Sequence, residues 1–115
     1  MDSSFWTQLD TLVQSSELVI DRPRGSRHPR ISSVVYPLDY GYLSDTSGGD
    51  GNEVDVWRGS LPETCLDAVV CTTDLRKRDT EVKLLIGCST EEKQIVCRFH
   101  ETNGMGVILI ERKAT

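Results

Sequence analysis

Tyrosines and carboxylates lie close together in residues 36–57, which read YPLDYGYLSDTSGGDGNEVDVW. All three tyrosines of the chain fall in the first seven positions of this stretch, and Asp50, Asn52, Glu53 and Asp55 follow within six residues. Carboxylate oxygens are the ligands that Mg²⁺ prefers, and a tyrosine hydroxyl donates hydrogen bonds to anions. The stretch therefore indicates a site that holds metal ions and an anion together, although GGDGNEVDV alone is also typical of an ordinary acidic hairpin.

The two aspartates can serve one ion only if the chain bends between them. Asp50 and Asp55 are five residues apart, so in one straight strand their side chains would face opposite ways. Gly51 permits the bend that turns both toward one face. A second acidic group, Asp74 and Asp79, flanks a basic turn. It favours a shared multi-metal site, while a charged hairpin tip is the common alternative.

A basic segment, residues 22–30 (RPRGSRHPR), holds four arginines and one histidine but no acid. The net charge of the whole chain is −5, which argues against a general nucleic-acid binder. A basic arm beside an acidic loop favours an anionic ligand with bridging cations, and two solvated surface strips are the alternative. Because a guanidinium group grips phosphate oxygens with two donors, Arg24, Arg27 and Arg30 are candidate phosphate contacts.

Length and composition indicate one soluble domain that spans residues 1–115. The chain is 37% hydrophobic and 27% charged, which is typical of a globular protein. No apolar run is long enough for a bilayer, and the first residues lack the features of a signal peptide. The four cysteines form no C-x-x-C pair. We therefore expect a cytoplasmic protein without membrane contact.

The periodicity of apolar residues predicts a mainly-β α+β fold with a helix near each end. The first helix should end near residue 14, because five apolar residues recur at helical spacing: Phe5, Trp6, Leu9, Leu12 and Val13. Strands are expected at 17–21, 33–36, 53–58, 66–73 and 81–87, and a last one within GVILIERK. Ser89 and Glu92 form a capping box that begins the second helix. Short strands with outer helices suggest a small barrel.

Alternation along TEVKLLIG predicts which side chains of that strand are buried. Val82, Leu84 and Ile86 should face the interior, and Glu81 and Lys83 should face solvent. Near the second helix, Cys97 and His100 are three residues apart. We interpret such a pair as packing rather than as a metal site.

These motifs resemble those of the soluble (family I) inorganic pyrophosphatases. YPLDYGYLSDTSGGDGNEVDVW resembles the family's Y-P-x-N-Y-G-Y…D-G-D-x-x-D-V block, VIDRPRGSRHPR resembles the segment before it, and TDLRKRDTEVKLLIG resembles the later D-x(4)-D-x-K segment. The resemblance covers residues 17–87 and is strongest to the short, truncated members. It implies a closed five-stranded OB-like barrel that hydrolyses pyrophosphate with Mg²⁺, in which carboxylates hold the ions and the ions activate water.

Matched position by position, the resemblance implies roles for individual residues. The metal ligands would be Asp50, Asp55, Asp74, Asp79 and Asp21. The catalytic positions would be Asp55, Asn52 and Asp50, and Tyr36, Tyr40 and Lys83 would bind substrate beside the three candidate arginines. Three positions differ from the family pattern. Asn52 replaces an acid and cannot accept a proton as a base. Asp39 replaces an asparagine. Glu81 stands where the family has its lysine, and Lys83 follows two residues later, so Glu81 is a second candidate for the ligand role of Asp79.

The leading functional prediction is Mg²⁺-dependent hydrolysis of pyrophosphate or a related phosphoanhydride. A catalytically impaired relative that still binds metal and phosphate is the first alternative, because of Asn52 and the truncations. An OB-like nucleic-acid-binding module is the second alternative, although we expect no nucleic-acid partner. The apolar face of the first helix permits a homo-oligomer.

Overall fold

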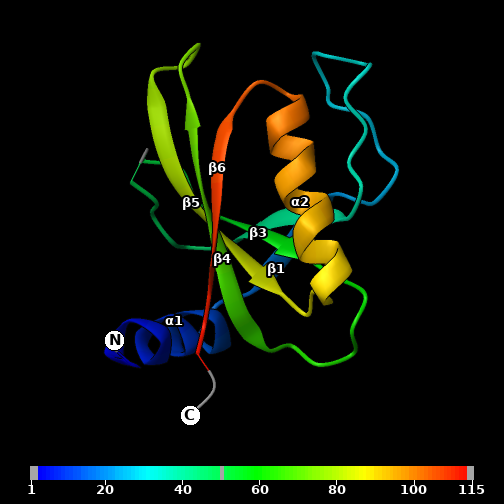
Figure 1. Cartoon of the computed structure of the whole chain (residues 1–115). Helices are drawn as coiled ribbons and strands as arrows, with labels where there is room; N and C mark the ends of the chain where they lie inside the picture. The colour runs from blue at the N-terminus through cyan, green and yellow to red at the C-terminus, as the bar shows by residue number, and fades with distance from the viewer. Residues whose placement is uncertain (1–2, 50, 114–115) are drawn as a thin grey trace.

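The computed structural model describes residues 3–49 and 51–113. All strands in that part of the chain belong to one sheet, with the neighbour order β1-β2-β3-β5-β4-β6 (Figure 1). The mainly-β α+β class with two helices is therefore confirmed. The elements are α1 (Ser3–Gln14), β1 (Leu18–Arg22), β2 (Asp39–Leu43), β3 (Val54–Arg58), β4 (Leu66–Asp74), β5 (Asp79–Ile86), α2 (Thr90–Thr102) and β6 (Gly106–Glu111).

The sheet differs from the expected barrel in two respects. Within residues 3–49 and 51–113 it has six strands instead of five, and no pairing joins β1 to β6 to close it. The strand expected at 33–36 is absent, because Tyr36 closes a loop instead: its N–H donates to the carbonyl of Ser26, and its carbonyl accepts from Gly25. Val35 forms only an isolated bridge with Arg27. The strand at this point of the chain is β2, three residues further on.

Helix α1 covers one face of the sheet near the C-terminal end of the chain (Figure 1). Trp6 is buried there with Leu43, Val56 and Leu84, so the predicted apolar face of the helix is confirmed for its largest residue. Phe5 is an exception to the prediction, since it is 48% exposed.

Helix α2 covers the opposite face (Figure 1). The predicted capping box is confirmed: Ser89 Oγ accepts from the N–H of Glu92, and Glu92 Oε1 accepts from the N–H of Ser89. Val96 of α2 is fully buried in the same apolar cluster as Trp57 and Leu85. No helix in the described part of the chain is long and apolar enough to cross a membrane.

Two features of the sheet position polar side chains on the face covered by α2. Strands β3 and β5 pair in parallel with Val56 opposite Leu84, which brings Asp55 beside Lys83. Gly41 lets β2 lie close to β1, because a Cβ at this position would collide with the carbonyl of Val19. Tyr40 and Tyr42 flank this glycine, so the close approach of β1 explains the glycine of the Tyr-Gly-Tyr sequence.

Candidate functional site

Lys83 lies at the centre of a group of polar side chains from β2, β3 and β5. Its Nζ donates to the hydroxyl of Tyr40 at 2.8 Å and to Oδ2 of Asp55 at 2.9 Å, and it lies 3.5 Å from Oε1 of Glu81. The Lys83 side chain is only 7% exposed, and Asp55 is 27% exposed. The predicted outward orientation of Lys83 is wrong, because β5 turns Lys83 toward the interior and leaves Val82 half-exposed.

The charges of this group are set by burial and by mutual contact. Burial alone would lower the pKa of Lys83, but its contacts with Tyr40 and Asp55 outweigh burial and raise the pKa above its ordinary value. Burial raises the pKa of Tyr40, so its hydroxyl stays protonated at neutral pH. Lys83 is therefore a cation, Tyr40 a neutral hydrogen-bonding group and Asp55 their shared acid. We call these three residues the Lys83 triad.

Behind Tyr40 lies a buried pair that the sequence analysis did not assign to the site. The Tyr40 ring packs edge-on to Trp57 at 4.6 Å between centroids, and Trp57 Nε1 donates to Nε2 of His100 at 3.1 Å. Burial and the charge of Lys83 lower the pKa of His100 to about 4, so it is neutral at pH 7. Cys97 is partly buried against the same cluster, in line with packing of the Cys97 and His100 pair.

Arg22 and Tyr36 form a second contact between a cation and a phenol. The guanidinium of Arg22 donates to the Tyr36 hydroxyl and lies 5.5 Å from the centre of its ring. The register between β1 and β2 shifts at Asp21, since Ile20 and Arg22 face consecutive residues of β2. Such a bulge re-aims side chains, and Asp21 is left exposed. Arg22 was not predicted as a site residue, although it belongs to the arginine-rich segment.

The arginine loop, residues 23–35, is folded back onto Tyr36. His28 stacks on the Tyr36 ring at 6.5 Å, and its Nδ1 accepts from the N–H of Arg30 at 3.0 Å. Arg27 donates from Nη1 to the carbonyl of Ser32 at 2.7 Å, so its guanidinium is engaged within the loop. Arg24 is placed by its backbone N–H, which donates to Asp39. All three candidate arginines have exposed side chains.

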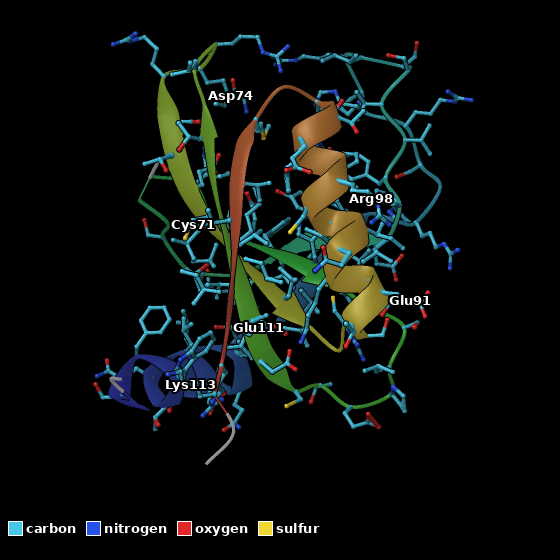
Figure 2. The ribbon with its side chains drawn as sticks, viewed as in Figure 1. Cys71, Asp74, Glu91, Arg98, Glu111 and Lys113 are labelled. Carbon is cyan, nitrogen blue, oxygen red and sulfur yellow. The ribbon has the colours of Figure 1, made fainter. Side chains whose placement is uncertain are left out.

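The second acidic group lies at the end of the β4–β5 hairpin. Asp74 and Asp79 are directly opposite in the strand register, so the sheet brings this predicted pair together. Figure 2 shows Asp74 at this end of the hairpin. Asp74 is buried and accepts from the N–H of Arg76 at 3.0 Å. Residues 79, 81 and 83 lie on the same face of β5, and Lys83 is about 13 Å along the strand from Asp79. Glu81 lies between them and contacts Lys83 at 3.5 Å.

The acidic loop before β3 is described only in part. Asp50, a predicted ligand and catalytic residue, lies outside the described residues. Gly51 has a φ of 87°, in the left-handed region that the predicted bend requires. Asn52 is exposed, and its carbonyl accepts from the N–H of Gly48.

The fit of Mg²⁺ depends on how many carboxylates meet. Among the described residues, no three His, Cys, Asp or Glu side chains are grouped closely enough to hold a metal ion. Mg²⁺ does not need such a cage, because it usually keeps several waters and binds one or two carboxylates together with substrate phosphates. Partly exposed Asp55 supplies a carboxylate of that kind. The described side chains thus fit an ion held jointly with a ligand.

The site combines hydrogen-bond donors with a partly exposed carboxylate. Lys83 and Tyr40 offer N–H and O–H donors, and Arg22 lies on the neighbouring Tyr36, whose ring is 5.4 Å from that of Tyr40. Donors of this kind, held partly away from water, bind an oxyanion more strongly than solvated ones. No protein-family model matches the chain, and no curated protein or solved structure matches it.

Proposed function

We propose that the protein hydrolyses inorganic pyrophosphate, or a related phosphoanhydride, in a Mg²⁺-dependent reaction at the Lys83 triad. One observation carries the proposal: Lys83 Nζ lies within hydrogen-bond distance of both a tyrosine hydroxyl and a carboxylate. The proposal includes an OB-like arrangement of the sheet. Two features of the sheet support it: β3 and β5 pair in parallel within an otherwise antiparallel sheet, and the two edge strands of the described part of the chain, β1 and β6, are not paired with each other. The OB fold is likewise a partly open barrel of strands.

Asp55 takes the place of an anion in the structure. Its carboxylate accepts from Lys83 just as a phosphate oxygen would. When Asp55 turns toward a cation, Lys83 and Tyr40 become available to a phosphate group of the substrate. Bound Mg²⁺ would neutralise phosphate charge and lower the pKa of a coordinated water. Lys83 would then hold the anion, and Tyr40 would donate from a hydroxyl that burial keeps protonated.

The exposed arginines of the loop also support a substrate that carries phosphate groups. Arg24 and Arg30 are exposed on a loop that Tyr36 and His28 anchor beside the triad. Their positive charge raises the local concentration of a small polyanion. A buried cation at Lys83 and exposed arginine side chains on the loop suit a ligand with two phosphate groups.

A second candidate is binding of metal and phosphate without turnover. Asn52 favours it, because an amide at the middle acid position of the motif cannot remove a proton from water.

Phosphate release from pyrophosphate, measured with Mg²⁺ and again with a chelator, tests the proposal. We expect release only with Mg²⁺, loss of release in Asp55→Asn, and faster release in Asn52→Asp. Asp45→Asn is the matched control, because Asp45 is an exposed acid that precedes the same loop. No release above background, with Mg²⁺ binding retained by calorimetry, would establish the second candidate instead. An unchanged rate in Asn52→Asp would show that position 52 does not provide the base.

A further inference from the structure

An apolar row crosses the face of the sheet that α1 covers only in part. The strand register places Val82 of β5, Cys71 of β4 and Ile108 of β6 side by side. Val82 is 49% exposed and Ile108 is 60% exposed. Two residues along the same strands, Val69 and Leu84 are buried in the apolar cluster under α1. Helix α1 therefore covers these two residues but leaves Val82 and Ile108 exposed. We call Val82, Cys71 and Ile108 the outer row.

The outer row ends at an open strand edge. Strand β6 is the last in the sheet order, and within the described residues nothing pairs with its second side. Its sequence, GVILIE, contains no lysine or proline, which protect edge strands from pairing, and its one charged residue is Glu111 at the end of the strand, which contacts Lys93 of α2. An edge of this type is a template for another strand.

Neighbouring elements leave this edge accessible. Helix α2 packs on the other face of the sheet, where Val107 and Leu109 of β6 join its apolar cluster (Figure 1). Arg112, just after β6, donates to Asp10 of α1 at 2.9 Å and to the carbonyl of Leu66 at 3.3 Å. Its side chain is therefore turned toward its own chain and away from the edge.

We propose that β6 pairs with β6 of a second copy of this chain, antiparallel about a two-fold axis that passes between the two Ile108 residues. A two-fold axis perpendicular to a sheet keeps each side chain on its own face of the sheet. The residue at the axis then lies opposite the same residue of the second copy. In this register Ile108 faces Ile108 of the second copy. The two outer rows then form one continuous apolar row across six strands, and Ile110 covers Gly106 of the second copy.

The charges at the two ends of β6 complement each other in this register. Glu111 of one copy lies opposite Met105 of the other (Figure 2 shows Glu111 toward the lower end of β6). Within its own chain Glu111 contacts Lys93 at 3.0 Å, but Lys93 also contacts Asp67 at 3.0 Å, so these three side chains together keep one negative charge, and Glu111 remains 58% exposed. Arg76 donates to the carbonyl of Asn103 at 2.9 Å and lies next to Gly104, so its guanidinium sits near Met105. Antiparallel pairing therefore brings Glu111 of each copy toward Arg76 of the other, at both ends of the interface. A parallel arrangement would place like charges together.

The register is tested by crosslinking at the axis. Opposite residues of antiparallel strands have Cα atoms about 4.5–5.5 Å apart, which is within the range of a disulfide, about 4.4–6.8 Å. In a Cys65→Ser, Cys71→Ser background, which removes the exposed thiol and the thiol directly opposite position 108 in the same chain, Ile108→Cys should give a covalent dimer on mild oxidation. Val82→Cys is the matched control on the same row. Five strand spacings, about 24 Å, separate it from its mate, so it should not crosslink.

The mass of the assembly in solution tests the interface itself. Sedimentation should give the unaltered chain twice the mass of one copy, and Ile108→Thr, which retains β-branching, should shift it to a folded monomer. A larger assembly in which Ile108→Cys still crosslinks would contain the same pair. A monomeric unaltered chain, an unshifted Ile108→Thr variant, or equal crosslinking at positions 82 and 108 would each overturn the proposal. None of these readouts depends on phosphate hydrolysis.

Discussion

Lys83 and the arginines of the loop, residues 23–35, occupy contrasting environments. Lys83 is buried on the sheet, with Tyr40 and Asp55 held at hydrogen-bond distance by the pairing of β2, β3 and β5. The arginines of the loop are exposed and are positioned by a few contacts within 23–36. Strand pairing therefore positions Lys83 in the interior, whereas the side chains of the loop arginines lie in solvent. The contrast suggests that Lys83 sets where an anion binds and that the loop attracts it.

The largest effect should follow from removing the charge of Lys83. Lys83→Met keeps the length of the side chain but leaves Tyr40 and Asp55 without their donor. We expect the free energy of unfolding to fall by about 2–4 kcal/mol, measured by urea denaturation. Because the cost comes from the orphaned acid, adding Asp55→Asn to Lys83→Met should recover part of it. A loss below about 1 kcal/mol in Lys83→Met would contradict the contrast between the two environments.

Acid should produce the next largest effect, through the two histidines. His100 has a folded-state pKa of about 4, below its ordinary value of 6.5. Between these values the unfolded chain binds a proton that the folded chain does not. The contribution of His100 to the free energy of unfolding is therefore fully present above pH 6.5. It is lost as the pH decreases toward 4, which lowers the free energy of unfolding by an amount on the order of 3 kcal/mol.

Urea denaturation at a series of pH values measures this loss, and variants assign it. His100→Gln should flatten the acid dependence, because it removes the group that must stay neutral beside Trp57. His28→Asn should change it less. Burial and the charges of Arg22, Arg30 and Lys77 also lower the pKa of His28, but it is only partly buried, on the loop. An unchanged acid dependence in His100→Gln would refute the assignment.

The smallest effect should come from the exposed loop. Arg27→Gln removes one hydrogen bond, from Nη1 to the carbonyl of Ser32, in solvent. We expect the free energy of unfolding to change by less than about 0.5 kcal/mol in the same urea assay. Arg30→Gln, whose guanidinium is exposed nearby, serves as the comparison. A loss near that of Lys83→Met would show that the loop is a structural element of the fold.

Local signals in the sequence predicted the elements that depend on local interactions. The capping box at Ser89 and Glu92 begins α2 as expected, since both partners lie within one turn. The meeting of Asp74 with Asp79 follows from a short hairpin, which the sequence indicates directly.

The remaining features depend on contacts between distant segments. Alternation predicted that Val82 is buried and Lys83 exposed. The reverse holds, because Asp55 and Tyr40 compensate the buried charge and α1 does not reach Val82. The contact of Trp57 with His100 joins residues 43 positions apart, so no local pattern indicates it. The strand expected at 33–36 is replaced by a loop in which Tyr36 bonds to Gly25 and Ser26. The β-propensity of residues 33–36 does not indicate these contacts.

The two tryptophans of the chain lie in different apolar clusters, one under α1 and one beside α2. Trp6 has the guanidinium of Arg112 5.8 Å from its ring, and Trp57 has the imidazole of His100 as its partner. Fluorescence of single-tryptophan variants thus reports separately on the docking of α1 and on the surroundings of Lys83. Coincident unfolding curves from the two fluorophores would mark one cooperative unit, and separate curves would reveal two.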